Sequence, residues 1–208
     1  MLQEKIHTYN ASFTTGALLL HESRVIIPLL LNGDTEGVKR EINTGEALKL
    51  NAFASRRKKV GEIRKRFIHV KPSVWQQFVE SEEQEQMLIL YYACLKTYSI
   101  LKDFQIDILL KKWLNYSLDY DKYVFLDFLF RQSATHPEID AWTDETKDKL
   151  SSVVNVMLTE VGLLKEGKLK ELNIKEGAWQ QFALLNEYWF MEALFMSDEQ
   201  RQTISQNL

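Results

Sequence analysis

Apolar residues recur at helical spacing along most of the chain, and turn-forming residues separate one such segment from the next. The pattern predicts a first helix over 15–31, which Pro28 should bend or end, because proline lacks the backbone donor that a helix needs. After a glycine turn, Asp34 or Thr35 is placed to cap a second helix over 36–42. The chain therefore opens with two short helices in quick succession.

A third helix is predicted over 51–67, after a break at Thr44-Gly45. Its apolar residues fall on one stripe, which we expect to face the interior: Phe53, Val60, Ile63 and Phe67. Three short helices joined by tight turns are typical of a helix-turn-helix unit. We therefore assign residues 1–70 to an N-terminal helix-turn-helix-like basic region.

Beyond this region the pattern predicts helices separated by proline, glycine or polar residues. They begin at Pro72 and then cover 87–113, 119–130, 143–161 and 179–196. Between the last two, a stop at Gly162 and a short charged hairpin around Gly167 are typical of a winged helix. The predicted fold class is all-α, with a central helical core over 71–140 and a winged-helix-like region over 141–208, unless all three regions form one compact unit.

Composition agrees with a soluble helical protein. The hydrophobic fraction of 45% and the charged fraction of 26% are globular values, and 3 prolines and 8 glycines are few for a sandwich or barrel. Cys94 is the single cysteine, which excludes an intramolecular disulfide and favours a reducing compartment. The most apolar stretch, 17–31, is interrupted by charged residues and is shorter than the roughly 20 residues of a membrane-spanning helix. We expect no contact with a membrane.

The positive charge is concentrated in one window. Residues 39–71 contain 11 Lys or Arg and 3 Glu, a net charge of +8, whereas the whole chain has a net charge of −3. A basic segment in an otherwise acidic protein is typical of a surface that faces a polyanion.

The predicted third helix carries most of these cations. If its apolar stripe faces inward, the helical pitch places Lys58, Lys59, Glu62, Lys65 and Arg66 on the opposite side, with Arg57 and Arg64 flanking them. Such a face binds phosphates, and a helix also fits the major groove, where arginine reads guanine edges. Asn51 and Ser55 could contact phosphate or simply cap the helix. The candidate DNA-binding residues are Lys39, Arg40, Asn51, Ser55, Arg56, Arg57, Lys58, Lys59, Arg64, Lys65 and Arg66.

Two other interpretations of the basic helix stay open. It could bind an acidic protein partner or an acidic segment of its own chain, and the run Glu80–Glu85 could fold against it and mask it. It could also be an ordinary solvated face or a contact with an anionic membrane.

No signature of an enzyme, a metal site or a cofactor site is present. The sequence has no Walker A loop, dinucleotide fingerprint, nucleophile elbow or HExxH motif, and its 4 histidines are scattered. Cys94 lies in an apolar helix, where a buried and unreactive thiol is expected. The cluster Tyr188-Trp189-Phe190 could stack on bases, but a place in the core is the favoured interpretation.

The chain also resembles a known family. The stretch YNASFTTGALLLHESRVIIPLLLNGD, then VKREI, LNAFASRRKKVGEIRKRF, EEQEQMLILYYACLKTYSILKDF and TDETKDKLSSVVNVMLTEVGLL are similar to BrxA, the small helical component of BREX phage-exclusion systems. This resemblance implies a cytoplasmic, mostly helical DNA-binding protein that is similar in fold to the antitermination protein NusB. It also implies action beside a methyltransferase and an ATPase.

From the charge pattern and the family resemblance together, we expect a non-enzymatic protein that binds double-stranded DNA within a bacterial phage-defence system. The alternatives are a protein-interaction adaptor within the defence complex and an RNA-binding module.

Overall fold

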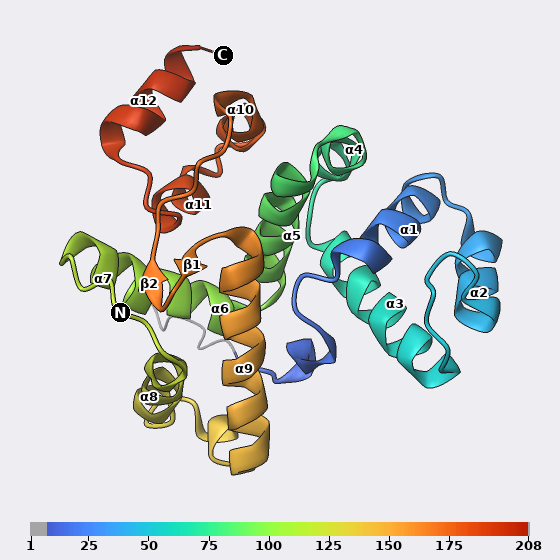
Figure 1. Cartoon of the computed structure of the whole chain (residues 1–208), viewed down its shortest axis with the longest axis horizontal. Coiled ribbons are helices and arrows are strands. Elements are labelled where there is room, and N and C mark those ends of the chain that lie inside the picture. Colours follow the sequence, from blue (N-terminus) through green and yellow to red (C-terminus); the bar gives the residue numbers. More distant parts are fainter. Residues whose placement is uncertain (1–7, 208) are drawn as a thin grey trace, which may run out of the picture.

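A computed structural model describes residues 8–207 of the chain (Figure 1). Helices account for most of this range, in which the β-structure consists of one two-stranded hairpin and an isolated bridge. The predicted all-α fold is therefore confirmed. The boundaries of the three regions, 1–70, 71–140 and 141–208, stay predictions.

The described chain begins with a short 3₁₀ turn, η1 (Ser12–Thr15), followed by α1 (Leu20–Leu31). The predicted start of this helix at residue 15 is wrong, because Leu19 adopts a left-handed backbone with a φ of 62°. Pro28 lies inside this helix and does not end it. The helix continues to Leu31, and the N–H of Asn32 donates to the carbonyl of Pro28 at 3.1 Å.

Two more helices complete an N-terminal group of three. The first, α2 (Thr35–Thr44), begins after Asp34, whose carboxylate accepts a hydrogen bond from the N–H of Gly37 at 2.8 Å. Gly45 ends α2 with a φ of 68°, a conformation that glycine adopts easily. The second, α3 (Phe53–Ile68), follows a turn, and α1, α2 and α3 all contact one another.

The next two helices are α4 (Pro72–Glu80) and α5 (Glu83–Thr97). Every residue of α5 from Leu88 to Leu95 is buried, so this helix is surrounded by other elements. The prediction of one helix over 87–113 is wrong, because the backbone of Tyr98 is extended, with φ −122° and ψ 102°. Three consecutive helical segments follow: α6 (Ser99–Phe104), the π-helical turn η2 (Gln105–Leu110) and α7 (Lys111–Leu114).

The C-terminal part contains further helices and the hairpin. Its elements are α8 (Lys122–Gln132), η3 (Pro137–Ile139), α9 (Asp144–Val161), β1 (Leu164–Lys165), β2 (Lys168–Leu169), α10 (Glu176–Leu184), α11 (Tyr188–Ala193) and α12 (Asp198–Gln206). The predicted hairpin is confirmed: Glu166 and Gly167 form its tight turn and both have positive φ. The single helix predicted over 179–196 is wrong, because Asn186, also at positive φ, separates α10 from α11.

Figure 1 shows how these parts are arranged. The group α1–α3 forms one end of the molecule, α5 lies in the middle, and α8, α9 and the hairpin lie on the other side. On α5 pack α3, α4 and α9, and η1 contacts both α3 and α9. The basic third helix is therefore held from behind by the core, while its outer side faces away from it. Among the described residues, no helix combines the length and apolar character required to cross a membrane.

Candidate nucleic-acid interface

The cations of α3 lie on two opposite faces of the helix, and four of them are on the exposed face. Arg57 and Lys58 are exposed, and so are Arg64 and Lys65, which follow two helical turns later, roughly 10 Å along the axis. Within residues 8–207 none of these four side chains takes part in an ion pair. We call these four residues the α3 cation stripe.

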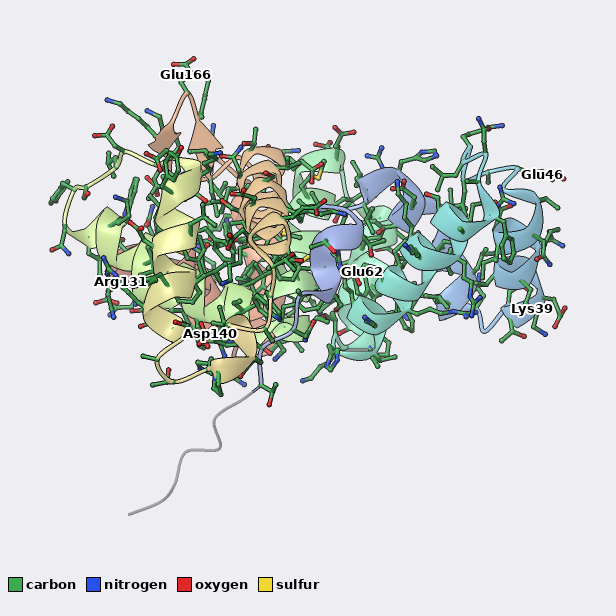
Figure 2. The ribbon with its side chains drawn as sticks, turned by 90° about the horizontal axis from the view of Figure 1, so that it is seen from below. Lys39, Glu46, Glu62, Arg131, Asp140 and Glu166 are labelled. Atoms are coloured by element: carbon green, nitrogen blue, oxygen red, sulfur yellow. The ribbon has the colours of Figure 1, made fainter. Side chains whose placement is uncertain are left out.

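A cleft runs beside the stripe, between α3 and η1. Its volume is about 660 Å³, and its lining residues are Ser12, Thr15, Phe53, Ala54, Arg57, Lys58, Gly61, Glu62 and Lys65. In Figure 2, Glu62 is labelled where the ribbon of η1 lies beside α3. Three residues of the cation stripe thus border a concave surface rather than a flat one.

Arg66 lies on the opposite, buried face of α3, with only 1% of the residue exposed. Its Nε donates to the Glu62 carboxylate at 3.0 Å and its Nη1 donates to the carbonyl of Leu18 at 3.0 Å. The hydroxyl of Tyr98 donates to the same carboxylate. Burial lowers the pKa of the Arg66 guanidinium, but the electrostatic effect of the nearby Cys94 and Glu62 side chains outweighs burial and raises that pKa. The expectation that Glu62 and Arg66 face solvent is wrong.

Arg56 is the second buried arginine of α3, with 6% of the residue exposed. Its guanidinium donates at 2.7 Å to four backbone carbonyls, those of Ile42, Asn43, Leu50 and Asn51. These carbonyls lie at the two ends of the turn between α2 and α3. Arg56 therefore fixes this turn and is not available to a phosphate, so its expected place on the DNA-facing side is wrong.

Two further candidate lysines are engaged in ion pairs. The Nζ of Lys59 lies 2.5 Å from the carboxylate of Glu22 on α1, and only 23% and 10% of the two side chains are exposed. Lys59 therefore joins α3 to α1, and its expected outward position is also wrong. Lys39 pairs with Glu36 at 2.7 Å on the exposed surface of α2, where a phosphate could replace the carboxylate.

The other candidates lie around the stripe. Arg40 and Asn51 are exposed and Ser55 is half-buried. Phe53, which was expected in the core, is 50% exposed. Lys49, in the turn between α2 and α3, is exposed near these residues, although it was not among the candidates. Its place in the basic window was the only signal for it.

The acidic run 80–85 does not mask α3. Glu83 pairs with Arg24 at 3.0 Å, and Glu82 pairs with Lys175 at 3.3 Å. In the part of the chain that the structure describes, neither carboxylate forms an ion pair with α3. Masking of α3 by this acidic run is therefore contradicted, although Glu22 of α1 does pair with Lys59.

Outside α3, the hairpin and the residue that follows it carry three exposed lysines: Lys165, Lys168 and Lys170. The sequence predicted the hairpin but named no site residue on it. Cys94 is buried, as predicted, and burial raises the pKa of its thiol to about 11. Phe190 is buried and packs against Tyr92 and Phe182, which confirms the core interpretation of this aromatic residue.

Comparison with known proteins identifies relatives of this chain. The family model BrxA matches residues 7–177. The curated "BREX protein BrxA" of Paramagnetospirillum magneticum (strain ATCC 700264 / AMB-1) is 25% identical over 193 residues, which are 91% of this chain and 97% of that protein. The "BREX protein BrxA" of Escherichia coli O9:H4 (strain HS) is 24% identical over 160 residues, 76% of this chain and 74% of that protein.

The fold is also similar to a solved structure. The crystal structure of an uncharacterized protein from Magnetospirillum magneticum matches with a TM-score of 0.78 and 25% identity, over 90% of this chain and 98% of that one. The resemblance seen in the sequence is thus confirmed by the family model and the curated relatives. Because the family model spans most of the sequence, this chain belongs to the BrxA family.

Proposed function

We propose that this chain is a non-enzymatic accessory protein of BREX phage defence that binds duplex DNA, mainly through the phosphates. Membership of the BrxA family supports the role in BREX defence. The DNA-binding part of the proposal rests on one observation: four exposed cations form a stripe along α3 and have no ion-pair partner among the described residues.

The stripe matches the charge spacing of a nucleic acid. Duplex DNA carries one negative charge per roughly 1.7 Å of its axis, so a cationic stripe about 10 Å long meets several phosphates at once. Each cation that neutralises a phosphate releases condensed counterions, which favours binding without any contact to a base. Unpaired arginine and lysine side chains are free to do this, whereas Arg56, Lys59 and Arg66 already have partners.

The supporting geometry is that of a helix presented on a three-helix group. Because α1, α2 and the core cover only the inner side of α3, its outer side can approach a groove of the duplex. The Arg56 contacts hold the preceding turn, so the start of α3 keeps a fixed direction. Because phosphate contacts carry no sequence information, an interface made mainly of them should show only a modest preference for particular DNA sequences.

The first test is the dependence of DNA affinity on salt. If the four stripe residues and the exposed Arg40 each neutralise one phosphate, log affinity should fall against log salt with a slope of about −4.5. Fluorescence anisotropy with a random-sequence duplex at several salt concentrations measures this slope. A flat dependence would exclude a phosphate-dominated interface.

The second test is reversal of the stripe charges. The variant R57E/K58E/R64E/K65E should lose binding, because attraction becomes repulsion, while its helical circular dichroism stays unchanged. A matched control reverses four exposed cations elsewhere, K111E/K122E/R131E/K149E, and gives the same change in net charge. Equal losses in both variants would show that only net charge matters and would reject α3 as the site.

A second candidate function, a protein-interaction adaptor, is favoured by exposed apolar side chains on α7, on α8 and on the segment between them. The four exposed side chains are Leu114 (64%), Tyr116 (90%), Tyr123 (59%) and Phe130 (81%). Exposed apolar residues on neighbouring elements suit a protein partner. Changing all four to serine should abolish binding of a purified BREX methyltransferase or ATPase and leave the DNA salt slope unchanged. Competition between duplex DNA and structured RNA for the protein distinguishes DNA binding from the RNA-binding alternative.

A further inference from the structure

The cleft between η1 and α3 has chemistry that the phosphate contacts alone do not use. Its rim carries Arg57, Lys58 and Lys65, whereas its remaining lining is apolar or accepts hydrogen bonds. With a volume of about 660 Å³, it is several times larger than a single phosphate group needs. A phosphate would meet the rim cations without entering the cleft.

One wall of the cleft is aromatic. Phe53, the first residue of α3, is 50% exposed and lines the cleft. Two turns along the helix, Gly61 leaves the surface without a side chain, and a Cβ added there would meet no other atom within 4 Å. The wall from Phe53 to Gly61 is therefore open and can receive a flat ring.

The floor of the cleft accepts hydrogen bonds. Ser12 and Thr15 of η1 contribute hydroxyl oxygens, and Glu62 contributes a carboxylate whose charge is balanced by Arg66. These oxygens can accept hydrogen bonds from the exocyclic amino groups of adenine, cytosine and guanine. Cations at the rim and acceptors at the floor thus suit the two ends of one nucleotide.

We infer that this cleft accepts an unpaired base, which stacks on Phe53 while the rim cations bind the neighbouring phosphates. The inference rests on the proposed DNA binding and adds a preference for DNA that contains unpaired bases. A paired base inside a duplex has both faces covered by its neighbours and cannot enter a concave site. Stacking on an aromatic side chain is tolerant of sequence, because every base has a flat π face.

The experiment compares three DNA probes of equal length: a paired duplex, a duplex with a central bubble of unpaired bases, and the same bubble with abasic nucleotides. The abasic bubble keeps the phosphates and removes the rings. The protein should bind the bubble about tenfold more tightly than the paired duplex or the abasic bubble, as expected for one or two stacked bases.

The variants are F53A, which removes the ring, and F53W, which keeps an aromatic face. F53A should bind all three probes with the affinity that the unchanged protein has for the paired duplex, and F53W should keep the preference for the bubble. The matched control is I68A, at the other end of α3, because Ile68 is 76% exposed but does not line the cleft. I68A should behave as the unchanged protein does.

The outcomes separate the two proposals. Equal affinity of the unchanged protein for the bubble and the abasic bubble, or an unchanged preference in F53A, would overturn the base-binding inference and leave duplex binding intact. Loss of the preference in I68A as well as F53A would also overturn it. Absence of binding to all three probes would instead reject the proposed function.

Discussion

The inner and outer faces of α3 carry the same types of residue in opposite environments. Arg56 and Arg66 are buried on the inner face, whereas Arg57 and Arg64 are exposed on the outer one. The neighbours Arg56 and Arg57 differ only in the direction in which the helix points them. Position on the helix, and not residue type, therefore decides which arginine stabilises the fold and which is available to a ligand.

The energetic reason is the cost of removing a charge from water. A buried guanidinium is stable only when its donors and its charge are matched, as the Glu62 carboxylate and the Leu18 carbonyl match Arg66. An exposed guanidinium keeps its hydration and gives it up only to a partner such as a phosphate. Counting the cations in a basic helix therefore overstates the size of a DNA interface.

The largest expected effect is that of removing Arg66. R66M leaves the buried Glu62 carboxylate without its counter-charge, which should lower the free energy of unfolding by about 3–5 kcal/mol. On the outer face, R64M should change it by less than about 0.5 kcal/mol. Urea unfolding followed by circular dichroism measures both. Similar values for the two variants would contradict the distinction between the faces.

A smaller effect is expected at Arg56. R56A removes a charged donor from four carbonyls and should lower the free energy of unfolding by about 2–3 kcal/mol. R56K should restore little of this, because an ammonium group cannot form the planar fork of a guanidinium. Thermal unfolding of R56A, R56K and the exposed control R57A measures the difference. If R56K were as stable as the unchanged protein, charge alone would hold the turn.

The ion pair Lys59–Glu22 should stabilise the fold by less than the buried arginines and by more than the exposed cations. A double-mutant cycle with K59M and E22Q should give a coupling of about 1 kcal/mol, because both side chains are largely buried. The exposed pair Lys39–Glu36 should give less than about 0.5 kcal/mol in the same measurement. The reverse order would mean that burial does not control these couplings.

The smallest effect on stability is expected on the outer face itself. Changing Arg57, Lys58, Arg64 or Lys65 singly to alanine should alter the free energy of unfolding by less than about 0.5 kcal/mol. Each change should reduce the magnitude of the salt slope for DNA binding by about 1. If an alanine variant has a lower free energy of unfolding but an unchanged salt slope, the replaced residue stabilises the fold and does not contact DNA.

Much of the fold could be predicted from the sequence. Helical spacing and turn residues located most helices, the cap at Asp34 and the hairpin turn at Gly167, because these features depend on local chemistry. The break at Tyr98 and the shortened first helix depend on tertiary packing, which a local pattern does not contain.

The orientation of α3 could be predicted only in part. Val60 and Ile63 are buried as expected. Because Phe53 was assigned to the same buried face, the solvent-facing side of the helix was predicted too close to Glu62 and Arg66. The spacing of apolar residues cannot reveal a polar network in the core, because the sequence does not distinguish a buried charged residue from an exposed one. The partner residues Leu18 and Tyr98 lie far from α3 along the chain, so nothing near Arg66 indicated its burial.

Leu18 joins the two halves of the molecule through its own backbone. Its N–H donates to the Glu160 carboxylate of α9 at 2.9 Å, and its carbonyl accepts from Arg66 of α3. One residue is thus anchored in two directions by helices on either side of α5. A shift of this short backbone segment would therefore disturb contacts of both α3 and α9, and α9 in turn adjoins the hairpin.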